Sequence, residues 1–197
     1  MTIGVLALQG AFFEHVEMLK RLNVEAREVR QKKDLDGLSG LIIPGGESTT
    51  ISLLMKNQSL RDELIKAIEG GLPVYGTCAG AILLSKKVEG KKLSERLSVM
   101  DIEIERNAYG SQLDSFEEDL VLNLDGEERH FYAIFIRAPK ITGVGENIDV
   151  LAKNSMSEIV MAREKNMLVT TFHPELTDDS GVHQYFLKMC EKFTQNL

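Results

Sequence analysis

The sequence has few cysteines and no long apolar run, and both shortages narrow what the chain can be. Two cysteines in 197 residues are too few for a disulfide framework, so each is expected to be a free thiol in a reducing compartment. No apolar run reaches the roughly 18 residues that a membrane-spanning helix needs. The first residues, MTIGVLALQG, show neither the basic leader nor the cleavage site of a signal peptide. We therefore expect a cytoplasmic protein that makes no contact with membranes.

Positive charge is also scarce. The chain has 23 Lys and Arg against 30 Asp and Glu, a formal net charge of -7, and no block rich in Lys or Arg. It therefore offers no attraction for a nucleic-acid backbone or an anionic membrane surface. Nucleic acid is not an expected partner.

The distribution of apolar residues indicates one α/β domain over residues 1–197. The composition, 43% hydrophobic and 27% charged, fits one globular domain, and no repeat, low-complexity tract or Pro/Gly linker marks a second. Apolar runs of strand length at 3–8, 41–44 and 72–75 lack polar alternation and are joined by helical patterns. This order predicts a three-layer, open, mostly parallel sheet flanked by helices, with some antiparallel edge strands. Further strands are expected at 101–105, 119–124, 131–136, 159–163 and 168–172, and helices at 60–69 and 181–194.

One cysteine stands at the junction between a strand-like and a helix-like run. The segment Gly76-Thr77-Cys78-Ala79-Gly80 is a G-x-C-x-G counterpart of the nucleophile elbow. A sharp turn there would lift the thiol above the sheet, and the N–H of Ala79 would point toward an oxyanion beside the sulfur. The alternative is a small buried cysteine between packing glycines. Cys190 differs, because it belongs to a helical apolar stripe and is expected in the core.

A cysteine nucleophile needs a base, and the base needs an acceptor that orients it. His173 ends the apolar strand LVTTF, at the strand end where open α/β sheets place their ligands. Glu175 follows two residues later and would face the same side in an extended conformation, where it could orient the ring. The alternative is a surface His-Pro turn with a solvated glutamate. The other histidines are expected to be ordinary solvated or satisfied side chains, two on helices and one in a charged turn: His15, His183 and His130.

A second backbone donor is needed for the oxyanion, since each donor is worth about 3 kcal/mol. The segment Pro44-Gly45-Gly46-Glu47-Ser48 follows a strand and opens a helix, so its N–H groups can face the same crevice as Cys78. The hydroxyls that follow, from Ser48 onward, can cap the helix start. A P-loop is excluded because no Gly-Lys-Ser/Thr occurs at the required spacing. An ordinary glycine-rich turn is the alternative.

Taken together, these segments resemble a known enzyme family. IIPGGEST (42–49), YGTCAGAILL (75–84) and TFHPEL (171–176) occur in the order found in class I, or triad, glutamine amidotransferases. The likeness implies their flavodoxin-like fold. It narrows further, over essentially the whole chain, to the glutaminase subunits of pyridoxal 5'-phosphate synthases. Four segments carry this likeness: LALQGAFFEH (6–15), PGGESTT (44–50), ERNAYGSQLDSFE (105–117) and FIRAP (135–139).

The resemblance implies a reaction and a role for each residue of the triad. Cys78 would attack the side-chain amide of L-glutamine, His173 would act as base and then acid, and Glu175 would orient His173. Ammonia would leave, and water would hydrolyse the glutamyl thioester to L-glutamate. The N–H groups of Gly46 and Ala79 would stabilise the oxyanion. No cofactor and no metal are implied.

Glutamine also requires a cation for its α-carboxylate, and arginine suits a carboxylate better than lysine. Arg137 lies in the apolar run FYAIFIRAP, where an unpaired guanidinium would be costly, so we expect it to have a partner. For Arg106 and Arg137 an internal salt bridge that holds loops is the alternative. By resemblance, the glutamine site comprises Gly46, Glu47, Ser48, Arg106, Ile136 and Arg137.

The family resemblance implies a partner as well. A synthase subunit would receive the ammonia and build pyridoxal 5'-phosphate, with both subunits in a large hetero-oligomer. Gln9, after the first strand, is hypothesised to switch on the glutaminase when the partner docks, by reorienting the Gly46 peptide. Rival interpretations are the glutaminase subunit of imidazole glycerol phosphate synthase, and a cysteine peptidase or stress protein of similar fold. The latter commonly places a histidine where Ala79 follows the cysteine. An intact Cys, His and Glu set disfavours a catalytically silent module.

Overall fold

Parallel strands form the centre of the molecule. The structure is a computed structural model that describes residues 1–89, 95–106 and 115–195. Its central strands lie in the order β2-β1-β3-β4-β12, and all but the edge strand β2 are almost completely buried, as parallel strands covered on both faces should be. Their bounds are β1 (Thr2–Leu6), β2 (Glu25–Val29), β3 (Gly40–Ile43), β4 (Val74–Thr77) and β12 (Met167–Thr170).

Beyond β12 the same sheet becomes mainly antiparallel. Strand β11 runs antiparallel to β12, to β9 and to β10, while β6 runs antiparallel to β9 and parallel to the edge strand β5. These strands are β5 (Ser85–Glu89), β6 (Met100–Glu105), β9 (Lys140–Val144), β10 (Asp149–Lys153) and β11 (Ile159–Glu164). The expected α/β sheet with antiparallel edge strands is confirmed.

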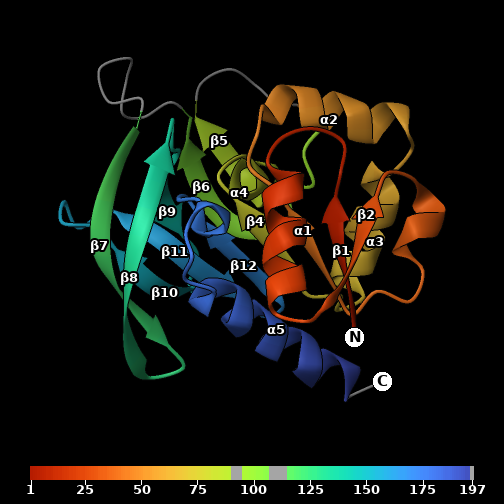
Figure 1. The fold of residues 1–197 in the computed structure, drawn as a ribbon. Coiled ribbons are helices and arrows are strands. Elements are labelled where there is room, and N and C mark those ends of the chain that lie inside the picture. The colour runs from red at the N-terminus through yellow and green to blue at the C-terminus, as the bar shows by residue number, and fades with distance from the viewer. Residues whose placement is uncertain (90–94, 107–114, 196–197) are drawn as a thin grey trace.

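Helices cover both faces of the sheet (Figure 1). On one face, Val16 of α1 and Phe186 of α5 share a core with Ile42 of β3. On the other, Ile51 of α2 shares a second core with Ile43, the next residue of the same strand, because successive strand residues point to opposite faces. The three predicted layers are therefore present. The helices are α1 (Phe12–Arg21), α2 (Ser48–Asn57), α3 (Arg61–Glu69), α4 (Ala79–Leu84) and α5 (Gly181–Thr194), with short 3₁₀ turns η1 (Lys32–Leu35) and η2 (Pro174–Leu176).

A separate hairpin, β7 (Ser115–Leu124) and β8 (Glu127–Ile136), lies beside α5 over the antiparallel part of the sheet (Figure 1). Phe131 and Phe135 of β8 belong to the same core as α5, and the Phe135 ring meets the Phe172 ring edge-on at 5.7 Å. The backbone N–H of His173 donates to the Ile134 carbonyl at 2.8 Å. These contacts fix the end of β8 next to the segment that follows β12.

Most predicted elements are confirmed with shifted ends. The helix expected at 181–194 coincides with α5, and the strands expected at 159–163 and 168–172 are β11 and β12, which pair as a hairpin. His130 was expected in a charged turn, and this is wrong: it lies in β8, because the turn falls at Asp125 and Gly126. Both turn residues have positive φ, 55° and 90°. Strands β2, β5, β9 and β10 were not expected from the sequence.

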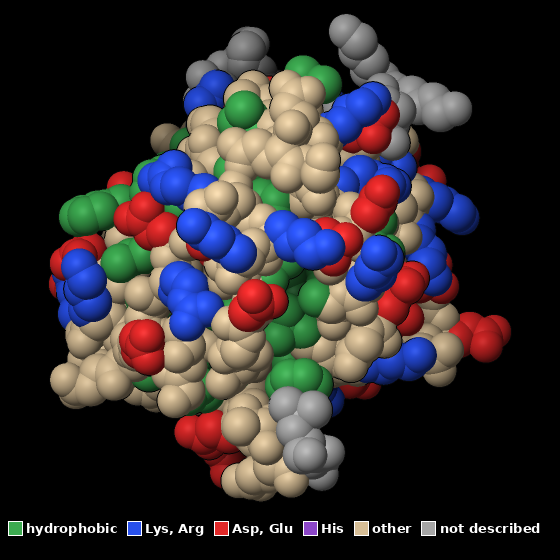
Figure 2. Space-filling view, turned by 90° about the vertical axis from the view of Figure 1, so that its right-hand side faces the viewer, with side chains coloured by type: hydrophobic (Ala, Val, Ile, Leu, Met, Phe, Trp, Pro, Cys, Tyr) green, Lys and Arg blue, Asp and Glu red, His purple; other side chains and the backbone are tan. Residues whose placement is uncertain are grey.

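The surface on the side of α2, α3 and β2 carries acidic and basic side chains interspersed with one another (Figure 2). Exposed ion pairs link elements here, for example Lys32 Nζ of η1 with Glu63 Oε1 of α3 at 3.1 Å. Such pairs contribute at most about 1 kcal/mol each. Within the described parts of the chain, no helix is long and apolar enough to cross a membrane.

Candidate active site

Candidate site residues gather where strands end. Gln9 follows β1, Gly46 follows β3, Cys78 follows β4 and His173 follows β12, and carboxyl ends of parallel strands share one edge of a sheet. Arg137 comes from a different direction, at the end of β8. A pocket of about 470 Å³ opens at this edge, a size suited to a small ligand.

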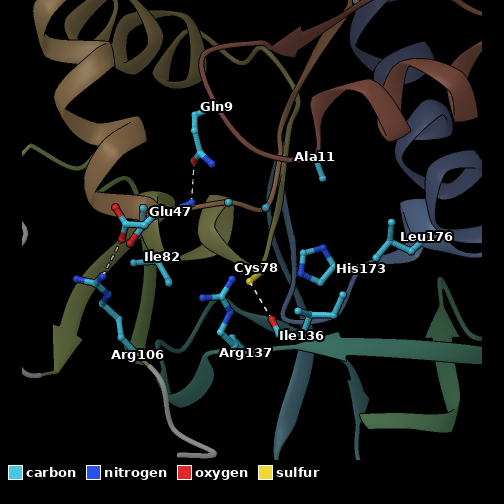
Figure 3. Close-up of a pocket in the computed structure, with 13 residues that line it drawn as sticks. Gln9, Ala11, Glu47, Cys78, Ile82, Arg106, Ile136, Arg137, His173 and Leu176 are labelled. Atoms are coloured by element: carbon cyan, nitrogen blue, oxygen red, sulfur yellow. Dashed lines mark hydrogen bonds and ion pairs between the residues drawn. The ribbon is translucent and has the colours of Figure 1, made fainter. Parts of the chain in front are cut away.

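The structure brings most of the predicted residues together in this pocket (Figure 3). Ala79 and Glu175 do not line it, and both are buried. The sequence did not single out the lining residues Ala11, Ile82 and Leu176. The predicted residues that line the pocket are Gln9, Gly46, Glu47, Ser48, Cys78, Arg106, Ile136, Arg137 and His173.

Cys78 stands on a strained turn between β4 and α4. Its backbone has φ 47° and ψ -100°, the left-handed region that side chains other than glycine rarely adopt. Its N–H donates to the Thr170 carbonyl at 2.8 Å, which anchors the turn to β12. A Cβ on Gly80 would lie 2.1 Å from the Ile43 carbonyl oxygen, so glycine is required there. The predicted sharp turn between strand and helix is confirmed, and the role of Cys78 as nucleophile stays a prediction.

His173 and Glu175 form the predicted pair. Nδ1 of His173 lies 2.7 Å from Oε1 of Glu175, and the two residues are 7% and 6% exposed. The expected extended geometry is wrong, however. Residues Pro174–Leu176 form a 3₁₀ turn. This turn brings the Glu175 carboxylate back to the His173 ring.

Burial and charge act against each other at this pair. Burial lowers the pKa of His173, but hydrogen bonds with Cys78 and Glu175 and the charge of Glu175 outweigh it and raise the pKa to about 10. Burial likewise raises the pKa of Glu175, but His15 and His173 outweigh it, and the pKa lies below its ordinary value. At neutral pH His173 therefore holds a proton and Glu175 is charged.

The sulfur of Cys78 faces the pocket on the same side as the His173 ring (Figure 3). Its Sγ lies 4.0 Å from the Ile136 carbonyl oxygen at the end of β8. The interaction of the His173 ring with Cys78 is one cause of its raised pKa, and a cysteine beside such a base can act as a nucleophile. This arrangement can perform nucleophilic attack on a carbonyl carbon and protonate the group that leaves.

The peptide between Gly45 and Gly46 lies against the base. The Gly45 carbonyl accepts from the Ala11 N–H at 2.9 Å. Because the peptide is trans and planar, the Gly46 N–H points the opposite way, away from Ala11. A Cβ on Gly45 would lie 2.4 Å from Cε1 of His173, so only glycine allows this close approach. The oxyanion role of Gly46 and Ala79 remains a prediction with which this geometry is compatible.

Gln9 contacts the loop at a different peptide from the one expected. Its Oε1 accepts from the Glu47 N–H at 2.8 Å, so it holds the Gly46–Glu47 peptide rather than the Gly45–Gly46 peptide. Glu47 itself caps α2, because its carboxylate accepts from the Thr50 N–H at 2.8 Å. The cap expected from the Ser and Thr hydroxyls is therefore wrong.

The two arginines differ. Arg106 Nη2 lies 3.4 Å from Glu47 Oε1 and 3.4 Å from Thr49 Oγ1, which is the internal salt bridge that the sequence left open. Arg137 is exposed and has no ion pair within the described residues, so its expected partner stays a prediction. Its φ is 42°, and this turn after β8 directs the guanidinium toward Cys78 (Figure 3).

His15 was missed as a member of the site. It is fully buried, with Nδ1 2.9 Å from Nε2 of His183 and Nε2 3.6 Å from Oε2 of Glu175. Neither His15 nor His183 is solvated: both ring nitrogens of His15 have partners, whereas His183 has one through Nε2 only. One signal was available, because His15 lies beside Val16 on the apolar face of its helix.

Two further predictions concern the absence of a metal or cofactor and the motif ERNAYG. In residues 1–89, 95–106 and 115–195 no cluster of His, Cys, Asp and Glu could hold a metal ion, and the absence of metal and cofactor remains a prediction. The motif ERNAYG lies outside the described residues after Arg106.

Comparison with known proteins shows a consistent relationship. The model of the SNO glutamine amidotransferase family matches residues 5–192. The chain is 51% identical over 192 residues to pyridoxal 5'-phosphate synthase subunit PdxT of Thermosipho africanus, with 98% of this chain and 100% of the relative covered. It is 49% identical over 189 residues to the PdxT subunit of Thermus thermophilus, covering 95% and 96%.

Solved structures agree in fold. A crystal structure of glutamine amidotransferase superposes with a TM-score of 0.90 at 48% identity, covering 96% of this chain and 98% of that chain. PurLQS from Thermotoga maritima superposes with a TM-score of 0.67 at 13% identity, covering 99% and 97%, which is a likeness of fold alone. The fold expected from the resemblance is confirmed.

The raised pKa of His173 predicts a pH-dependent stability. Folding raises this pKa from 6.5 to about 10. The stabilisation of the folded state by His173 is therefore complete below pH 6.5 and is lost as the pH rises through about 10. Between about pH 7 and 10, the free energy of unfolding should fall more steeply in the native protein than in His173→Gln, by at most about 1.4 kcal/mol per pH unit. Urea denaturation across this range measures it. The exposed His130→Gln serves as control and should follow the native slope; equal slopes in all three proteins would contradict the prediction.

Proposed function

Because the chain belongs to the SNO glutamine amidotransferase family, we propose that it is the glutaminase subunit of a pyridoxal 5'-phosphate synthase, as its relatives are named. It hydrolyses L-glutamine to L-glutamate and ammonia in a single domain over residues 1–197. The observation that carries this proposal is the buried Glu175 carboxylate 2.7 Å from His173, beside a cysteine on a strained elbow.

The proposed reaction begins with attack by the Cys78 thiolate on the side-chain amide carbon of glutamine. The carbonyl oxygen takes the negative charge and is stabilised by the N–H groups of Gly46 and Ala79. His173 gives its proton to the amide nitrogen, the C–N bond breaks, and ammonia leaves with a glutamyl thioester on Cys78. His173, now neutral, takes a proton from water, whose oxygen attacks the thioester carbon. The C–S bond then breaks and releases L-glutamate.

Substrate orientation is assigned to the charged groups at the pocket. The glutamine α-carboxylate binds the guanidinium of Arg137, which has no other ion pair among the described residues and points toward Cys78 (Figure 3). The α-ammonium group binds near the partly exposed Glu47 carboxylate, which Arg106 holds from the other side. Ser48 and Ile136 complete the lining. A fixed pose of this kind brings the amide carbon to the sulfur.

The proposed partner is the synthase subunit that consumes the ammonia, in a large hetero-oligomer in the cytoplasm, where thiols such as Cys78 stay reduced. Gln9 is proposed to couple docking to activity through its hydrogen bond to the Glu47 N–H. Movement of this side chain would shift the Gly46–Glu47 peptide and, with it, the adjacent oxyanion donor. The names of the relatives support this subunit rather than that of imidazole glycerol phosphate synthase.

Replacement of the nucleophile tests the proposed activity. Ammonia release from glutamine should rise when the synthase subunit is added to the native chain, whereas Cys78→Ala should lower the rate about 10⁴-fold or more under both conditions. The matched control is Cys190→Ala, which removes the other buried thiol and should retain activity. Release of ammonia by Cys78→Ala at the native rate would exclude the mechanism.

Replacement of Arg137 tests the substrate pose. Arg137→Ala should raise the KM for glutamine about 10- to 100-fold, since a charge-assisted, bidentate contact is lost, and Arg137→Lys should recover part of it. Arg129→Ala removes an arginine of β8, the strand that Arg137 directly follows. Arg129 pairs with Asp179 instead, so the KM of this variant should stay native. An unchanged KM in Arg137→Ala, with lost stability, would assign Arg137 a structural role.

Replacement of Gln9 tests the coupling to the partner. Gln9→Ala removes the acceptor for the Glu47 N–H, so the ratio of ammonia release with and without synthase subunit should fall close to one. Gln184→Ala, an exposed amide on α5, provides the control for general effects of amide loss. Full stimulation of Gln9→Ala would refute the coupling.

A further inference from the structure

Two histidines that the mechanism does not use lie buried behind the triad. His15 of α1 and His183 of α5 are both 0% exposed, although they lie 168 residues apart in the sequence. Nδ1 of His15 lies 2.9 Å from Nε2 of His183. Nε2 of His15 lies 3.2 Å from Thr77 Oγ1, next to the nucleophile in sequence, and 3.6 Å from Oε2 of Glu175.

The pair of histidines faces the second oxygen of the Glu175 carboxylate, Oε2. Oε1 accepts from His173, but the buried Oε2 has no hydrogen-bond partner among the described residues. A buried carboxylate needs compensation for the water that it has lost. The His15 ring nitrogen at 3.6 Å is placed to supply it, provided that this nitrogen carries the proton.

The hydrogen-bond pattern selects one tautomer for each ring. Nδ1 of His183 is buried without a partner in the described structure, and an unpaired lone pair there costs less than an unpaired N–H. His183 therefore carries its proton on Nε2 and donates it to Nδ1 of His15. His15 must then carry its own proton on Nε2, directed at Thr77 and Glu175. The reverse assignment would leave an orphan buried N–H and turn a lone pair toward the carboxylate.

The surroundings keep these rings fixed and uncharged. Tyr75 of β4 meets His15 edge-on at 6.2 Å and His183 at 6.0 Å, and its hydroxyl bonds with Thr170 at 2.9 Å. The other groups that act on His15 are Glu175, His173 and Glu14 of α1. Burial lowers the pKa of His15 and lowers that of His183 to about 3. Neither ring gains a positive charge that would compete with His173 for Glu175.

We propose that His15 and His183 are positioning residues, a neutral imidazole pair that directs one N–H at Oε2 of Glu175 and so keeps this carboxylate charged and oriented for His173. This inference rests on the proposed glutaminase function. The pair acts through Glu175 and touches neither the substrate nor the reacting atoms.

Kinetics of the complex with the synthase subunit test the role of His15. In His15→Phe an aromatic ring is kept but the donor is lost, so kcat should fall about 10- to 100-fold, since a donor to a buried charge is removed, while KM changes less than about twofold. The pKa of Glu175 should rise, so the acid limb of the pH–rate profile should move to higher pH. His15→Gln, whose amide N–H can take the place of Nε2–H, should recover most of kcat and the native limb.

A matched variant separates positioning from general loss of packing. The matched variant is Phe186→Leu. Phe186 lies in the same core as Tyr75 and contacts its ring, at 5.6 Å between ring centroids, but its side chain makes no hydrogen bond to either histidine ring. The variant should lower the melting temperature and leave kcat and the acid limb unchanged. The proposal is overturned if His15→Phe behaves like Phe186→Leu, or if His15→Gln recovers nothing.

Imidazole nitrogen NMR of the native chain tests the tautomers without any activity assay, and so decides the matter even if His15→Phe fails to fold. Long-range ¹H–¹⁵N spectra should show both rings as neutral Nε2–H tautomers from about pH 5.5 to 8.5, the range in which an ordinary histidine titrates. An imidazolium, or an Nδ1–H tautomer at either ring, would overturn the inference. If the tautomers are as stated but Cys78→Ala still releases ammonia, it is the glutaminase function that fails.

Discussion

The contact between the Glu175 carboxylate and the His173 ring is the interaction on which the rest of the site depends. Both side chains are almost completely buried, and their 2.7 Å contact compensates for water that each has lost. Burial lowers the pKa of His173, but a hydrogen bond with Cys78 and this contact with Glu175 together outweigh it and raise the pKa to about 10, so the proton that the reaction needs is already on the base. The fold supports this pair from both sides, with the hairpin β7–β8 in front and α1 and α5 behind.

Strain at the pocket is stored in two backbone positions. Cys78 and Arg137 both have positive φ, 47° and 42°, and each ends a strand whose remaining residues are held in a hydrogen-bonded sheet. The packed strands stabilise these conformations, which a free peptide would rarely adopt. As a result, the sulfur and the guanidinium approach the pocket from the ends of strands in two different sheets. In the proposed mechanism, the residue after β4 therefore carries out the chemistry, and the residue after β8 orients the substrate.

The sequence predicts the buried parts of this molecule better than its edges. Continuous apolar runs identified β1, β3 and β4, whereas β2 and β5, with sequences EAREV and SKKVE, are polar edge strands with little periodic signal. Cys78, His173 and Glu175 were found from local patterns and family likeness, but the 3₁₀ turn that joins the last two was not. His15 escaped notice because a histidine on an apolar helix face gives no local sign of what lies opposite. The exposure of Arg137 was not expected, because a run of apolar neighbours in the sequence gives no sign of the turn at Arg137 itself.

The central claim is that Cys78 carries the glutamyl group during the reaction. Mass spectrometry of the complex with the synthase subunit, quenched in acid during turnover of L-glutamine, measures this directly. The account predicts a mass gain equal to glutamine less ammonia, located by proteolysis on the peptide that contains Cys78 and removed by hydroxylamine. An adduct on Cys190, or turnover with no adduct on Cys78 even when hydrolysis is slowed, would contradict it.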